Sequence, residues 1–74
     1  MDDSEQAWSE VYAVLPDGWT VMRPVWREAD QVWAVYAREV MGARREHEAW
    51  LEAYGESQAI ALRALAQQLR ERAR

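Results

Sequence analysis

Residues 55–74, GESQAIALRALAQQLRERAR, carry the clearest helical pattern in the chain. Ser57 is a favourable N-cap, and the arginines near the end suit the negative pole of the helix dipole. Apolar residues recur at helical spacing and form one stripe: Leu62, Leu65, Ala66, Leu69 and Ala73. Such a stripe must be buried against another layer, so we expect the tryptophan-rich segments before it to form a sheet beneath this helix.

The N-terminal segment predicts a second helix. Asp3 or Ser4 can cap it, and Pro16 should end it at about Leu15, because the residue before a proline is disfavoured in helical geometry. Four apolar residues follow at i, i+3, i+4 and i+7 and should form its buried stripe: Trp8, Val11, Tyr12 and Leu15. Residues 16–18, Pro-Asp-Gly, predict a turn.

Three segments between the helices favour strands. Residues 19–27 are rich in Val, Trp and Thr, but Pro24 lacks an N–H donor, so this strand should lie at a sheet edge or carry a bulge. Residues 31–40 are apolar on both faces, which indicates a central strand. Residues 44–54 alternate more clearly, although their Glu and Ala content also tolerates a helix.

The alternation in residues 44–54 predicts two unlike faces. The smaller set should face the helices: His47, Ala49, Leu51 and Ala53. The other set should lie on the outer face: Glu46, Glu48, Trp50, Glu52 and Tyr54. A register shift of one residue would exchange the two faces, so this assignment depends on the phase of the strand.

The predicted fold is therefore α+β. Helix, three strands and helix give an αβββα order, in which a three-stranded antiparallel meander packs both helices on one face. At 74 residues the chain should be a single domain spanning residues 1–74. A domain of this size buries only about 60% of its unfolded surface, so we expect modest stability or support from a partner.

This order resembles the double-stranded RNA-binding domain, and YGESQAIALRALAQQL (residues 54–69) is similar to that family's closing strand and alanine-rich last helix. The resemblance is one of topology and implies an RNA-binding fold. The basic cluster that RNA-binding members carry at the start of the last helix is absent from residues 57–62, and the loop at residues 28–30 is acidic. The strands and last helix also resemble small bacterial and phage domains of the HicB antitoxin type.

Composition and charge indicate the class of partner. The net charge is −4, made up of −5 over residues 1–37 and +1 over residues 38–74, and all nine basic residues are arginine. A negative surface disfavours nucleic acid and suits a basic protein, which could itself handle nucleic acid. No signal-peptide pattern and no apolar run of about 20 residues occurs, so a cytoplasmic protein without a membrane partner is expected.

Enzymatic activity, a cofactor and a metal site are not expected from the sequence. The chain has no cysteine and a single histidine, His47, for which a partly buried or rim position is the ordinary interpretation. No ligand spacing typical of metal sites occurs, and no serine lies in a nucleophile-elbow context. Glu46, Glu48 and Glu52 predict a solvated stripe or a surface that recognises a basic partner.

The functional hypothesis rests on the positions of the tryptophans. We expect Trp8 and at least two of Trp19, Trp26 and Trp33 in the core. The predicted partner-binding set lies on the outer sheet face and comprises Trp50, Tyr54, Glu48, Glu52 and Trp33. Aromatic residues and arginine are enriched in binding hot spots, and an exposed apolar sheet face usually marks an interface.

The first hypothesis for function is therefore a non-enzymatic protein-interaction domain that docks on a basic surface. Small acidic proteins of this composition resemble phage-encoded inhibitors such as anti-CRISPR proteins. The alternatives are a nucleic-acid binder of the double-stranded RNA-binding class, which would use Arg63, Arg70, Arg72 and Arg74, and a homodimeric antitoxin-like accessory protein. In the second alternative the open sheet face would form the dimer seam.

Overall fold

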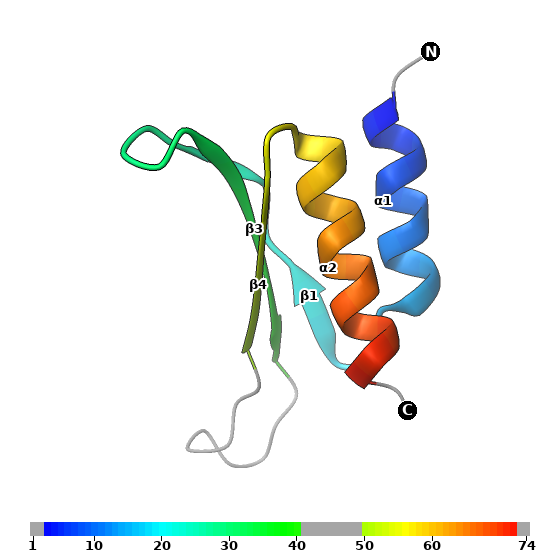
Figure 1. The fold of residues 1–74 in the computed structure, drawn as a ribbon. Helices are drawn as coiled ribbons and strands as arrows, with labels where there is room; N and C mark the ends of the chain where they lie inside the picture. The colour runs from blue at the N-terminus through cyan, green and yellow to red at the C-terminus, as the bar shows by residue number, and fades with distance from the viewer. Residues whose placement is uncertain (1–2, 41–49, 73–74) are drawn as a thin grey trace.

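The computed structural model describes residues 3–40 and 50–72, and these residues form two helices and a four-stranded antiparallel sheet (Figure 1). In chain order the elements are α1 (Asp3–Val14), β1 (Trp19–Val21), β2 (Val25–Arg27), β3 (Val32–Glu39), β4 (Trp50–Gly55) and α2 (Gln58–Arg72). The predicted α+β class is confirmed, and the sheet has four strands rather than three.

The strand β3 lies at the centre of the sheet. Its residues 33, 34, 37 and 38 each have two cross-strand partners, so β4 pairs along one side and β1 and β2 share the other. Residues 19–27 lie at the edge of the sheet, as Pro24 predicts, but they form two short strands with one extra residue between them relative to β3, instead of one continuous strand. Pro24 has no N–H to donate and separates two short strands, while the N–H of Met22 donates to the carbonyl of Tyr36 at 2.8 Å and keeps the chain beside β3.

Local sequence signals set the ends of α2 and α1. The N–H of Ile60 donates to the Ser57 hydroxyl at 3.1 Å, which confirms Ser57 as the N-cap of α2. The helix α1 ends at Val14, two residues before Pro16, as the proline predicts.

The buried stripe of α2 matches the prediction, whereas that of α1 includes Ala7 and lacks Tyr12. In α2 the predicted Leu62, Leu65, Ala66 and Leu69 are buried, and Ala73 lies outside the described residues. In α1 Ala7 and Val11 are buried, whereas Tyr12 is 61% exposed and stacks on Trp8. The inclusion of Tyr12 in the buried stripe is therefore wrong, because the core-facing side of α1 is centred on Ala7 and Val11 and lies away from Tyr12.

Both helices lie on one side of the sheet, with α2 between the sheet and α1 in the view of Figure 1. The helix α2 packs against β3, β4 and α1, and α1 packs against α2. The core between these layers is made of small and aliphatic side chains, including Val11, Val35, Ala37, Ala53, Leu62, Leu65 and Leu69.

Gly55, the last residue of β4, lets α2 approach the sheet closely. A Cβ atom at this position would lie 2.5 Å from the main-chain nitrogen of Ala61 and 2.6 Å from a side-chain carbon of Ile60. Only a residue without a side chain fits here.

The five tryptophans lie at the margins of this core. Trp8, Trp19 and Trp33 are partly buried and pack against it, while Trp26 is 40% exposed and Trp50 is 51% exposed. The sequence predicts Trp8 and at least two of Trp19, Trp26 and Trp33 in the core. Trp8, Trp19 and Trp33 pack against the core but are only partly buried.

The predicted third strand, residues 44–54, is described only as β4 from Trp50 onward. His47, Glu46 and Glu48 lie outside the described residues. Within residues 3–40 and 50–72, neither helix is long and apolar enough to cross a membrane.

Candidate functional site: the open face of the sheet

The side of the sheet turned away from the helices forms a second, uncovered surface. Cross-strand partners share a face, so the register assigns to this surface Thr20, Val25, Arg27, Val32, Ala34, Tyr36, Arg38, Trp50, Glu52 and Tyr54. We call these ten residues the open face. Within the part of the chain that the structure describes, neither helix packs on it (Figure 1).

Glu52 lies at the centre of the polar contacts on the open face. Residues 50, 52 and 54 point to the same side of β4, so the carboxylate lies between two aromatic side chains. The indole Nε1–H of Trp50 donates to Oε1 of Glu52 at 2.9 Å, and the hydroxyl of Tyr54 donates to Oε2. The two exposed rings are thereby fixed by one carboxylate.

These hydrogen bonds determine the charge on the open face. The bond from Tyr54, and after it the bond from Trp50, lower the pKa of Glu52 below its ordinary value. The same bond to Glu52 raises the pKa of the Tyr54 phenol. At neutral pH Glu52 is therefore a carboxylate, and Tyr54 is a neutral hydrogen-bond donor.

Two further residues of the open face complete the aromatic surface. The ring of Tyr36, opposite Glu52 in the register, lies 5.5 Å from the ring of Trp50. The guanidinium of Arg27 lies 5.7 Å from the centre of the Tyr54 ring and also pairs with Asp30 at 3.0 Å. The charge of Asp30 raises the pKa of Arg27, which stays cationic.

Exposure on the open face is concentrated in large side chains. Val25 and Trp50 are each 51% exposed and Tyr54 is 41% exposed, whereas Ala34 between Val25 and Tyr54 is fully buried. Large exposed rings beside aliphatic carbon are typical of surfaces that bind another molecule.

Of the predicted partner-binding set, the structure brings together Trp50, Glu52 and Tyr54. Glu48 lies outside the described residues. Trp33 lies on the helix-facing side, in phase with Val35, and its ring packs 5.7 Å from that of Trp26. Its placement on the outer face is wrong, because alternation along β3 puts it on the side that the core requires.

Seven members of the open face were not in the predicted partner-binding set, and Tyr36 and Arg27 are the two of them that contact its rings. Tyr36 lies between Val35 and Ala37 in the sequence and therefore points to the opposite side of β3. Once Val35 and Ala37 are assigned to the core, this alternation places Tyr36 on the open face. Arg27 contacts Tyr54 across the sheet, at a sequence separation of 27 residues, so no local pattern indicates this contact.

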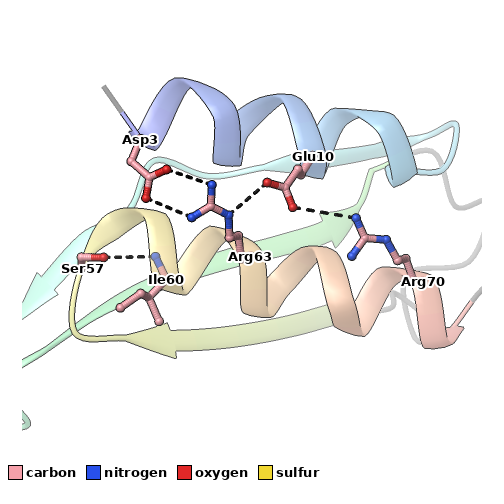
Figure 2. A network of polar contacts seen from close by, with 6 residues as sticks. All are labelled: Asp3, Glu10, Ser57, Ile60, Arg63 and Arg70. Carbon is pink, nitrogen blue, oxygen red and sulfur yellow. Dashed lines mark hydrogen bonds and ion pairs between the residues drawn. The ribbon is translucent and has the colours of Figure 1, made fainter. Parts of the chain in front are cut away.

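The arginines of α2 form contacts within the protein instead of a free basic surface. Figure 2 shows Arg63 between α2 and α1: Nη1 and Nη2 bind the carboxylate of Asp3 at 3.0 and 2.9 Å, and Nε binds Glu10 at 3.0 Å. Arg70 lies 4.0 Å from Glu10, and Arg72 lies 5.1 Å from the centre of the Trp19 ring. The hydrogen bonds that Arg63 donates to Asp3 lower the pKa of Asp3. The hydrogen bonds that it donates to Asp3 and Glu10 raise the pKa of Arg63.

A shallow hollow of about 620 Å³ lies where the N-termini of the helices meet the sheet, and it is lined by Asp3, Ser4, Trp33, Ser57, Gln58 and Ala59. Among residues 3–40 and 50–72, no group of three His, Cys, Asp or Glu side chains is placed to hold a metal ion. Compared with protein-family models, with curated proteins and with solved structures, the chain matches none.

Proposed function

We propose that this chain is a non-catalytic protein-interaction domain that docks its open face on a basic surface of a partner protein. The observation that carries the proposal is the arrangement of Trp50 and Tyr54, two half-exposed rings held by hydrogen bonds to the carboxylate of Glu52. Rings held in this way lose little freedom when a partner covers them, which favours binding.

The rings of the open face and the net charge of the whole chain support a basic partner. On the open face itself the charged residues are Arg27, which pairs with Asp30, together with Arg38 and Glu52. Tryptophan and tyrosine are the residue types that dominate binding hot spots. Glu52 supplies a fixed negative charge between them, and the whole chain carries a net charge of −4. A basic protein that handles nucleic acid is one such partner, and an inhibitor of the phage type would bind it by placing Glu52 where a phosphate would otherwise lie.

The nucleic-acid alternative receives less support from the arginines that it would need. Arg63 is engaged by Asp3 and Glu10, and Arg72 lies on the ring of Trp19. Contacts with phosphates would have to replace these internal pairs. The homodimer alternative uses the same open face. It differs from the proposal in that the partner is a second copy of the chain.

An affinity capture from host lysate tests the proposal, with the wild-type chain compared with the double variant Trp50→Ala, Tyr54→Ala. Losing two hot-spot side chains should weaken binding by about 30-fold or more. The matched control is Tyr12→Ala, Trp26→Ala, which removes the same residue types at exposed positions outside the open face. Circular dichroism verifies that both variants are folded.

The outcomes of this experiment distinguish the three candidate functions. Stoichiometric capture of one protein, lost in the open-face variant and kept in the control and after nuclease treatment, supports the proposal. Equal capture by both variants would refute the assignment of the open face. Capture that disappears with nuclease would favour nucleic-acid binding, and a concentration-dependent dimer in light scattering that the open-face variant splits would favour the homodimer.

A further inference from the structure

Arg27 shows how a guanidinium group binds on the open face. It lies over the ring of Tyr54, its Nη1 is 3.5 Å from the Tyr54 hydroxyl, and its Nη2 pairs with Asp30 at 3.0 Å. A planar cation thus lies over an aromatic ring while a carboxylate accepts a hydrogen bond from it. This combination suits arginine, whose guanidinium stacks on rings and donates in its own plane.

The other half of the open face contains the same two components. The ring of Trp50 is half-exposed beside Tyr36, and the carboxylate of Glu52 lies next to it. Each oxygen of Glu52 accepts one internal hydrogen bond and keeps capacity for another. The two cation–ring contacts within the described residues involve Tyr54 and Trp19, so the ring of Trp50 remains available.

We propose that Trp50 and Glu52 together receive one arginine side chain of the partner, whose guanidinium stacks on the indole and pairs with the carboxylate. This inference rests on the proposed function and specifies its partner chemistry. Lysine fits less well, because a compact ammonium cannot stack in a plane and donate two parallel hydrogen bonds at the same time.

Arg38 provides a test within the molecule. It is the cross-strand neighbour of Trp50 on the open face and is exposed, so its positive charge lies beside the proposed site. Like charges repel, and Arg38→Gln should therefore strengthen the binding of a cationic peptide. The same change should weaken the binding of a nucleic acid, which would use Arg38 to contact a phosphate.

The experiment is a titration of the whole chain followed by NMR, in which the indole N–H signal of Trp50 is identified by its loss in Trp50→Phe. The probe is a capped hexapeptide of alternating glycine and arginine. Two control peptides carry lysine, or uncharged citrulline, in place of arginine. We expect the arginine peptide to shift the Trp50 signal, the lysine peptide to bind several-fold more weakly, and the citrulline peptide to leave the signal unchanged.

Glu52→Gln is the decisive variant. It should lower the affinity for the arginine peptide by about tenfold, since hydrogen bonds to a charged group are stronger than those between neutral groups. Glu28→Gln is its matched control. The indole of Trp26 donates to Glu28 at 2.7 Å, as that of Trp50 does to Glu52, but Trp26 lies on the helix-facing side of the sheet. Glu28→Gln should leave the affinity unchanged.

Each outcome decides between this inference and the broader proposal. Equal affinities in Glu52→Gln and Glu28→Gln would overturn the arginine site, and the proposed function would still stand if lysate capture depended on Trp50 and Tyr54. Binding of a thymidine oligonucleotide at the Trp50 signal, weakened by Arg38→Gln, would overturn both in favour of nucleic acid. A dimer that hides the Trp50 signal from the peptide would overturn the inference in favour of a second copy.

Discussion

The two faces of β4 use opposite kinds of side chain, although these alternate along one strand. In β4, Leu51 and Ala53 point toward the helices, while Trp50, Glu52 and Tyr54 point away. The centre of the covered face is built from small and aliphatic residues, and the rings of Trp19, Trp26 and Trp33 lie at its margins. The open face carries the rings of Tyr36, Trp50 and Tyr54 on the side that no described helix covers.

The covered face lies close to α2 at Gly55, which has no room for a Cβ atom, and Ala53 and Ala37 belong to the same layer. Leu62, Leu65 and Leu69 of α2 fill the rest of that layer. We therefore expect the covered face to supply most of the stability and the open face to supply exposed rings, and this division can be tested by substitution.

The largest effect should come from the covered face. Leu65 is fully buried, and Leu65→Ala should destabilise the fold by about 2–5 kcal/mol, through lost burial and the cavity left behind. Tyr54→Ala on the open face should cost about 1 kcal/mol or less. Urea unfolding followed by circular dichroism measures both, and comparable costs would contradict the division between the faces.

The next effect tests the close approach itself. Gly55→Ala should destabilise the fold by about 1–3 kcal/mol, because the added methyl group meets the main chain of Ala61. Glu56→Ala, one residue later and exposed, is the control and should change little. If Gly55→Ala has the same urea midpoint of unfolding as the wild type, the close contact between Gly55 and Ala61 is not the constraint that we infer.

A smaller effect concerns the start of the covering helix. Ser57→Ala removes the acceptor of the Ile60 N–H and should cost about 1 kcal/mol. Ser9→Ala lies in the exposed middle of α1 and should be neutral or slightly stabilising, since alanine is the better helix former. The two variants differ only in position, so a similar urea midpoint would argue against the capping role.

The smallest effect involves the exposed seam between the helices and depends on pH. Arg63 lowers the pKa of Asp3 below its ordinary 3.8, so the pair stabilises the fold above that value and the contribution is lost as pH falls through the lower folded pKa. Asp3→Asn should therefore be less stable than wild type at neutral pH, and equal to it in strong acid. A constant difference at all pH values would contradict the pairing.

The helices could be predicted closely from the sequence because their ends depend on local chemistry. Ser57 caps α2 through its own hydroxyl, and Pro16 ends α1 by steric exclusion of the residue before it. Tyr12 is wrongly placed in the buried stripe because spacing alone does not tell on which residues the buried side of a helix is centred. In α1 that side carries Ala7 and Val11.

The candidate site could be predicted only in part, because it depends on the phase and register of the strands. The alternation in β4 correctly put Trp50, Glu52 and Tyr54 on one side. Trp33 was assigned to that side because both faces of β3 carry aromatic residues, so composition does not separate them. The contact between Arg27 and Tyr54 needs the three-dimensional pairing of β2 and β4 with β3, which one sequence does not specify.

The hydrogen bond from the side-chain amide of Gln68 to the main-chain carbonyl of Glu52, at 2.8 Å, has a consequence for solubility. The carbonyl of Tyr36 accepts from Met22 on the far side of β3, so its partner Glu52 directs its own carbonyl outward, along the rim of the sheet. An outward carbonyl is a point at which a foreign strand can attach and begin a fibril. Gln68 occupies that point, so a helix withholds this acceptor of the rim from a foreign strand.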